Sequence, residues 1–127
     1  MQVSAIKAGL AVLGVLLSTQ IANAQFNPGQ WVLSQYQGGV YYYPGVVVGQ
    51  QGNMVTTRYD DGDIDTRPSN QVKHYNWRPG TRVECNYRGA GQWYRGRISG
   101  MQGNTGLSIA YDDGDFENTV TGRCRSR

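Results

Sequence analysis

The sequence is poor in the residues from which most catalytic and metal-binding sites are built. Its 127 residues include one histidine, His74, and two cysteines. No Cys-x-x-Cys pair, metal-ligand cluster, nucleophile motif or Gly-rich phosphate loop occurs in it. The chain is also too short for a TIM barrel, or for a dinucleotide-binding enzyme with a second domain. We therefore expect a protein that is not an enzyme and that has no cofactor and no metal site.

Charged residues are also scarce, at 17% of the chain, and 14 aromatic residues are available for a core. Both features disfavour a disordered chain. Lys and Arg exceed Asp and Glu by only three, too few to indicate nucleic acid as a partner. Residues 76–127 nevertheless carry eight arginines against five acidic residues. This half of the chain favours an acidic partner, unless its arginines are ordinary solvated surface residues.

Long hydrophobic runs are absent after residue 24. Before it, Lys7 precedes an apolar run at 8–17, and Ala22-Asn-Ala24 has the small-x-small pattern of a signal-peptidase site. The run is shorter than the ~20 residues of a spanning helix, so a membrane anchor is the weaker alternative. We expect a signal peptide at 1–24 and a mature chain from Gln25 that is secreted or periplasmic, with no membrane span. Export would also separate the protein from DNA and RNA.

Glycine and tyrosine are abundant, and the chain contains an internal repeat. Its 18 glycines and nine tyrosines favour short strands and tight turns over helices. The motif Tyr-Asp-Asp-Gly-Asp occurs at 59–63 and again at 111–115, and further matches precede it in the same order. The mature chain is therefore expected to consist of two similar units, the first unit at 25–74 and the second unit at 75–127.

Each unit is expected to contain five short strands, because apolar and polar residues alternate between turn signals. The strands are placed at 30–36, 42–48, 54–59, 64–67 and 71–74, and at 81–87, 93–99, 107–112, 116–120 and 122–125. The side chains expected to face the core are Val32, Ser34, Val47, Val55 and Thr57, with their counterparts Val83, Cys85, Ile98, Leu107 and Ile109. Five strands in so short a unit predict a small closed or half-closed barrel. The short aromatic join at 73–79 predicts that the units touch in a fixed orientation.

The two cysteines lie in the first and last strands of the second unit, at Cys85 and Cys124. First and last strands commonly run side by side in small barrels, and an exported chain with two such cysteines most simply forms one disulfide. Closing a loop of about 39 residues would stabilise the fold by roughly 4 kcal/mol on the chain-entropy model. Two free buried thiols are the alternative.

The motif order in each unit resembles the Tudor domain, and the pair resembles a tandem Tudor reader. The motif residues are Val32, Tyr36, Tyr41–Tyr43, Gly45, Val47 and Tyr59–Gly62, and then Val83, Tyr87, Tyr94, Gly96, Ile98 and Tyr111–Gly114. The resemblance implies an all-β fold of two tandem five-stranded SH3-like (Tudor-like) barrels. It also implies an aromatic cage for methylated lysine or arginine, in which ring quadrupoles and an acid attract the cation.

The resemblance places the cage of the first unit on Tyr36, Tyr41, Tyr43, Tyr59 and Asp61. A secondary site in the second unit comprises Tyr87, Trp93, Tyr94, Tyr111, Asp113 and Phe116, with Gln92 interrupting the aromatic set. Two alternatives stay open. In the first, the tyrosines are lids over small cores and the acidic motifs are tight turns. In the second, calcium binds at these turns, although the EF-hand spacing is absent.

The implied function is a monomeric, exported binding module for a peptide or protein ligand. The alternative is a structural or cell-wall-associated SH3-like envelope protein without a cage ligand.

Overall fold

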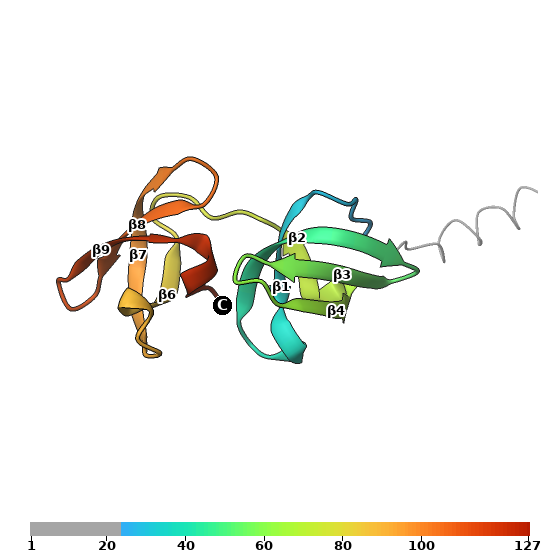
Figure 1. The fold of residues 1–127 in the computed structure, drawn as a ribbon, viewed down its shortest axis with the longest axis horizontal. Coiled ribbons are helices and arrows are strands. Elements are labelled where there is room, and N and C mark those ends of the chain that lie inside the picture. Colours follow the sequence, from blue (N-terminus) through green and yellow to red (C-terminus); the bar gives the residue numbers. More distant parts are fainter. Residues whose placement is uncertain (1–23) are drawn as a thin grey trace, which may run out of the picture.

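The computed structural model describes residues 24–127, which form two five-stranded antiparallel sheets. Figure 1 shows the sheets side by side, joined by one connecting segment, with the C-terminal end between them. The signal peptide expected at 1–24 lies outside the described residues, apart from Ala24. Within the described part, no helix has the length and apolar character needed to cross a membrane.

The two sheets repeat one topology. The first contains β1 (Trp31–Gln35), β2 (Tyr42–Gln51), β3 (Met54–Tyr59), β4 (Ile64–Pro68) and β5 (Val72–His74), in the order β4-β3-β2-β1-β5. The second contains β6 (Arg82–Asn86), β7 (Trp93–Gln102), β8 (Gly106–Tyr111), β9 (Phe116–Val120) and β10 (Cys124–Arg125), in the order β10-β6-β7-β8-β9. Short 3-10 turns follow β1, β4, β6 and β9, at Tyr36–Gly38, Ser69–Gln71, Tyr87–Gly89 and Thr121–Arg123. All ten strands overlap their predicted positions.

The strands β2 and β7 run three residues beyond the ranges predicted for them. In each, the pairing register shifts by one residue, between Val47 and Gly49 in β2 and between Ile98 and Gly100 in β7. A β-bulge inserts one unpaired residue and so changes the phase of the inward and outward alternation. The period of two that identified these strands therefore ends at the bulge, although the strand itself continues.

Neither sheet is closed into a barrel, so of the closed or half-closed barrels that the sequence predicts, the closed form is wrong. Among residues 24–127, β4 and β5 are the two edges of the first sheet, and β9 and β10 are those of the second. The last strand of each unit is too short to pair along two neighbours, since β5 has three residues and β10 has two. Each unit is thus an open antiparallel sheet with a buried face.

The buried face is the one that the alternation predicted. All ten core positions proposed from the sequence are at most 4% exposed. Phe26 and Val72 complete the core of the first unit. Because both units bury matching positions, the repeat extends from the sequence to the packing.

The core of the second unit also contains a residue of the first. Leu33 lies on β1 between Val32 and Ser34 and is fully buried, but it belongs to the same buried cluster as Trp77, Val83 and the two cysteines, and not to the cluster of the first unit. The sequence pattern places only the opposite face of β1 inside. The difference arises because the pattern describes each unit alone, whereas the outer face of β1 is covered by the second unit.

Backbone and aromatic contacts also join the units, so they touch as the aromatic join predicted. The N–H of Tyr42 donates to Ser126 O at 2.7 Å, and the N–H of Ser126 donates to Tyr42 O at 3.0 Å. Within the second unit, the indole of Trp77 donates to the side chain of the same Ser126, at 3.1 Å from Oγ. Tyr75 packs between Trp31 and Trp77, with ring centroids 5.9 and 5.5 Å away.

The predicted disulfide between Cys85 and Cys124 is confirmed. The two residues face each other across β6 and β10. In the first unit, Ser34 faces Val72 at the equivalent place on β1 and β5. The same register therefore places a covalent link in one unit and a non-covalent contact in the other.

Candidate functional site

Each unit gathers three tyrosines into a triad at one end of its sheet. The first triad is Tyr36, Tyr43 and Tyr59, with ring centroids 5.4 to 6.4 Å apart and planes at 75° to 87°. The second triad is Tyr87, Tyr94 and Tyr111, with centroids 5.5 to 6.5 Å apart and planes at 87° to 88°. Edge-to-face packing of this kind is the favoured arrangement of aromatic rings.

The same elements supply the triad in both units: the 3-10 turn after the first strand, the start of the second strand and the end of the third. Gln37 and Arg88 turn the chain after the first tyrosine of each triad with positive φ, at 52° and 55°. The turn reverses the chain, so that the second strand returns along the first and carries its tyrosine back to the same end. The repeat in sequence thus produces a repeated site.

The deepest tyrosine of each triad has a satisfied hydroxyl. Tyr59 is 3% exposed and donates to Ser34 Oγ at 3.0 Å. Tyr111 is 5% exposed and donates to Glu117 Oε1 at 2.7 Å. Burial raises the pKa of Tyr59 to about 12. Burial, together with the hydrogen bond to Glu117, also raises the pKa of Tyr111.

Stability is expected to fall as the pH rises from about 10 to about 12. An unfolded tyrosine has a pKa of about 10, so in this range the unfolded chain loses a proton that folded Tyr59 keeps. The contribution is complete below pH 10 and is lost as the pH passes the folded pKa. Urea unfolding at a series of pH values measures the fall. Tyr59→Phe should make it shallower, and an unchanged slope in that variant would contradict the assignment.

The acidic motifs form tight turns, as one sequence alternative proposed. The N–H of Asp63 donates to Asp61 Oδ1 at 3.0 Å, and the N–H of Asp115 donates to Asp113 Oδ1 at 2.9 Å. Gly62, between the two acids of the first turn, has a φ of 100°, which a residue with a side chain rarely adopts. The turn also acts electrostatically on the first triad, because the negative charge of Asp63 raises the pKa of Tyr36.

The second triad surrounds a small hollow. Its volume is about 130 Å³, and its lining residues are Tyr87, Tyr94, Tyr111, Asp113 and Asp115. Four of the six residues predicted for the secondary site therefore meet here. The guanidinium of Arg88 lies over the ring of Tyr87, with its carbon 5.2 Å from the ring centroid, although Arg88 does not line the hollow itself.

Trp93 and Phe116 are not part of this hollow, although the sequence placed both in the secondary site. Trp93 precedes Tyr94 on β7, and adjacent strand residues point to opposite faces. Its ring lies 6.3 Å from that of Tyr43 in the first unit. Phe116 is 58% exposed on the edge strand β9.

Of the residues predicted for the first cage, Tyr36, Tyr43 and Tyr59 lie together, and Asp61 belongs to the adjoining turn. Tyr41 lies elsewhere. Its hydroxyl donates to Glu84 Oε2 in the second unit at 3.1 Å. Tyr41 comes before the start of β2, and its ring is drawn into the contact between the units.

Arg125 lies beside the first triad, and the sequence pattern does not reveal this. Its guanidinium lies 3.8 Å from the ring centroid of Tyr41 and 4.1 Å from that of Trp93. It also donates to Tyr43 Oη at 3.0 Å and to Glu84 Oε1 at 3.1 Å. Arg125 thus places a positive charge beside the first triad, where it would oppose a cationic ligand.

The described part of the chain has no group of three or more His, Cys, Asp or Glu side chains arranged to hold a metal ion. His74 is exposed and packs against Phe26, with ring centroids 5.0 Å apart. In comparisons with known proteins, no protein-family model and no curated protein matches the chain.

Proposed function

We propose that this protein is an exported, non-enzymatic binding module that holds a cationic side chain of a peptide or protein in the hollow of the second unit. The observation that carries the proposal is the composition of that hollow: three tyrosine rings at nearly right angles, with Asp113 and Asp115 beside them. No basic residue is among those that line it.

The physical basis is the attraction of a cation to ring faces. A methylated ammonium cannot make many hydrogen bonds, but each ring face that it covers well contributes about 0.5–2 kcal/mol. The two carboxylates add an attraction that salt weakens. Methylated lysine or arginine is therefore the side chain that suits the hollow best.

The fold supports a Tudor-like, SH3-type assignment of the units. Five strands in each unit, the repeated strand order and the tyrosines at one sheet end are the features that such a module needs. The disulfide supports export, because disulfides persist mainly in oxidising compartments. A fold of this kind hosts many functions, so the proposed function depends on the hollow and not on the fold.

A peptide with trimethylated lysine, titrated against isotope-labelled protein, should shift the NMR signals of the second triad. Tyr87→Ala should weaken binding by roughly 2- to 30-fold, because it removes one wall of the hollow and with it a ring face worth about 0.5–2 kcal/mol. Tyr36→Ala is the matched control, since Tyr36 holds the equivalent place in the first unit. It should leave the affinity within about twofold, because a ring face that holds the cation is worth roughly 0.5–2 kcal/mol and Tyr36 supplies none.

These half-buried tyrosines are better targets than Tyr59 or Tyr111, whose truncation would open a cavity in the core and cost about 3–5 kcal/mol. Loss of binding in Tyr36→Ala alone would place the cage in the first unit instead. No shift at millimolar peptide would show that neither triad is a cage.

A structural role in the cell envelope, without a cage ligand, is the second candidate. It is favoured by one observation: the rings of each triad already pack edge to face, and the buried hydroxyls of Tyr59 and Tyr111 are already bonded. Sedimentation with purified cell wall, unchanged by Tyr87→Ala, would support this role.

A further inference from the structure

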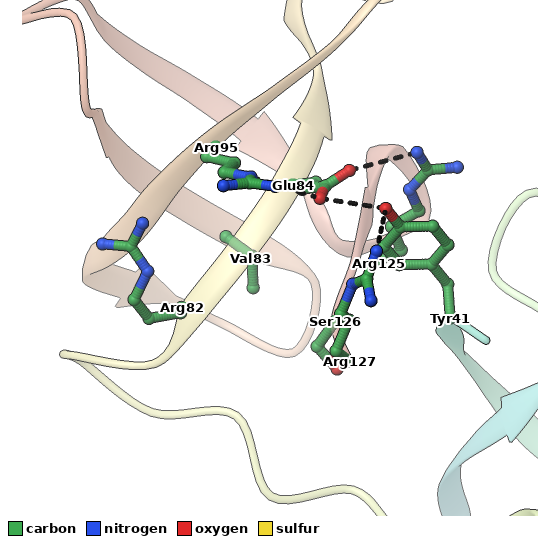
Figure 2. Close-up of a pocket in the computed structure, with 8 residues that line it drawn as sticks. All are labelled: Tyr41, Arg82, Val83, Glu84, Arg95, Arg125, Ser126 and Arg127. Atoms are coloured by element: carbon green, nitrogen blue, oxygen red, sulfur yellow. Dashed lines mark hydrogen bonds and ion pairs between the residues drawn. The ribbon is translucent and has the colours of Figure 1, made fainter.

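A second hollow, of about 400 Å³, lies where the two units meet. Its lining includes Arg82, Arg95, Arg125 and Arg127, and among the described residues that line it Glu84 is the single acid. Figure 2 shows Arg82 and Arg95 on one side of this arginine hollow, with Tyr41 of the first unit on the other. Four arginines against one glutamate leave an excess of positive charge in a confined space.

Glu84 is already occupied by contacts within the protein. It accepts hydrogen bonds from Tyr41 and Arg125, each at 3.1 Å, and Arg95 Nε lies 3.8 Å from it. Its side chain is only 15% exposed. The single negative charge is therefore shared mainly with the most buried arginine, and it cannot neutralise the others.

The remaining arginines are accessible. The side chain of Arg95 is 72% exposed, and that of Arg82 is 49% exposed with one terminal nitrogen 2.8 Å from Asp112 Oδ2. Arg82 also stands directly opposite Arg97 across β6 and β7. Like charges in such a cross-strand pair destabilise a sheet. Asp112 bonds to Arg82, whereas Arg97 donates to the carbonyl of Gly80, so one carboxylate faces two guanidinium groups here and a further anion would gain an attraction.

The fold that the two units share does not depend on arginines at these positions. At the places of Arg82, Arg95 and Arg97 in the second unit, the first unit has Trp31, Pro44 and Val46. The same fold is therefore made with an apolar outer face in the first unit and a basic one in the second. Arg125 is held between the rings of Tyr41 and Trp93, so part of the basic face is fixed in position before any ligand arrives.

We propose that the arginine hollow binds a ligand with two or more closely spaced oxyanionic groups, phosphate or carboxylate. The planar guanidinium fork matches both groups and can hold either with two parallel hydrogen bonds. A ligand with a single charge would engage one arginine, whereas a di-anion can bridge Arg82 and Arg95. This site is separate from the tyrosine hollow and does not depend on the function proposed for it.

Titration with inorganic pyrophosphate and with citrate, at constant ionic strength in sodium chloride, tests the proposal. Two double variants are compared with the unaltered mature chain by calorimetry and by NMR of the arginine Nε–H groups. Arg82→Gln with Arg95→Gln should weaken pyrophosphate or citrate binding at least tenfold. The matched control, Arg58→Gln with Arg78→Gln, removes the same charge from exposed positions outside the hollow and should leave binding within twofold.

Binding of pyrophosphate alone would identify a phosphate-bearing ligand, and binding of citrate alone a carboxylate-bearing one. Equal weakening in both double variants, or no binding of either anion, would overturn the proposal. If Arg82→Gln with Arg95→Gln fails to fold, Arg82→Lys with Arg95→Lys keeps the charge but removes the forks. Unchanged affinity after that second pair of substitutions would overturn the role of the guanidinium groups. The variant Tyr87→Ala should bind both anions normally. A negative result for the arginine hollow can therefore be distinguished from a negative result for the tyrosine hollow.

Discussion

Replacing Cys85 by serine and Cys124 by valine is expected to lower the free energy of unfolding by about 4 kcal/mol. The disulfide closes a loop that contains most of the second unit, from β6 to β10. Without it, the unfolded chain regains the freedom that the link removes. The substitution copies the residues that the first unit has at this place, where Ser34 faces Val72, so the new side chains fit the register.

Urea unfolding of the double variant, monitored by tryptophan fluorescence, measures this destabilisation. Trp77 and Trp93 both belong to the second unit and report on it. The unaltered protein under reducing conditions is the control, and its stability should fall by a similar amount because the same link is broken. A fall below about 1 kcal/mol in both would contradict a stabilising role for the disulfide.

Leu33→Ala is expected to lower the free energy of unfolding by about 3 kcal/mol, which is typical of a leucine truncated in a closed core. Leu33 is fully buried, and the other buried residues of its cluster belong to the second unit. The cavity would therefore open in the second core although the altered residue lies in the first sheet. Because Leu33 couples the two units, its truncation should also weaken the cooperativity with which they unfold.

Calorimetry and urea unfolding together test this expectation. Val48→Ala is the control, because Val48 lies on the neighbouring strand β2 and is 44% exposed. It should change the stability by at most about 0.5 kcal/mol. If Leu33→Ala costs no more than Val48→Ala, the side chain of Leu33 is not part of the second core.

The strands and their buried faces can be predicted because each depends on a local pattern that the sequence states twice. Alternation at Val32 and Ser34 is repeated at Val83 and Cys85, and two copies of a pattern are much stronger evidence than one. The disulfide can be predicted because its two cysteines lie in the first and last strands of the second unit, which pair with each other. The ends of β2 and β7 are not predicted. A bulge in each strand shifts the inward and outward alternation by one residue, and the apolar pattern of the sequence does not show where this shift occurs.

The contacts between the units cannot be predicted in the same way. Leu33, Tyr41 and Arg125 all make contacts across the junction. The hydrogen bond of Tyr41 across it joins residues 43 apart in the chain, and that of Arg125 to Tyr43 joins residues 82 apart. A pattern that describes each unit alone assigns the outer face of β1 to solvent. The cage position of Tyr41 is implied by the resemblance, which likewise considers each unit alone, and neither the pattern nor the resemblance gives Arg125 a role.

One error in the predicted site is avoidable from the sequence. Trp93 and Tyr94 are neighbours on a strand, so alternation already excludes that both face one hollow. The resemblance to a cage selects residues by their aromatic character, without regard to the direction in which each side chain points.

The backbone bridge between Tyr42 and Ser126 determines how the molecule would respond to a pulling force. Ser126 follows Cys124 by two residues, so the two hydrogen bonds that tie Ser126 to the first unit connect, through the disulfide, with β6. The hydrogen bonds are much weaker than the disulfide. When the C-terminal end is pulled away from Tyr42, we expect these two hydrogen bonds to break before the disulfide, while the covalent segment between β5 and β6 keeps the two units tethered.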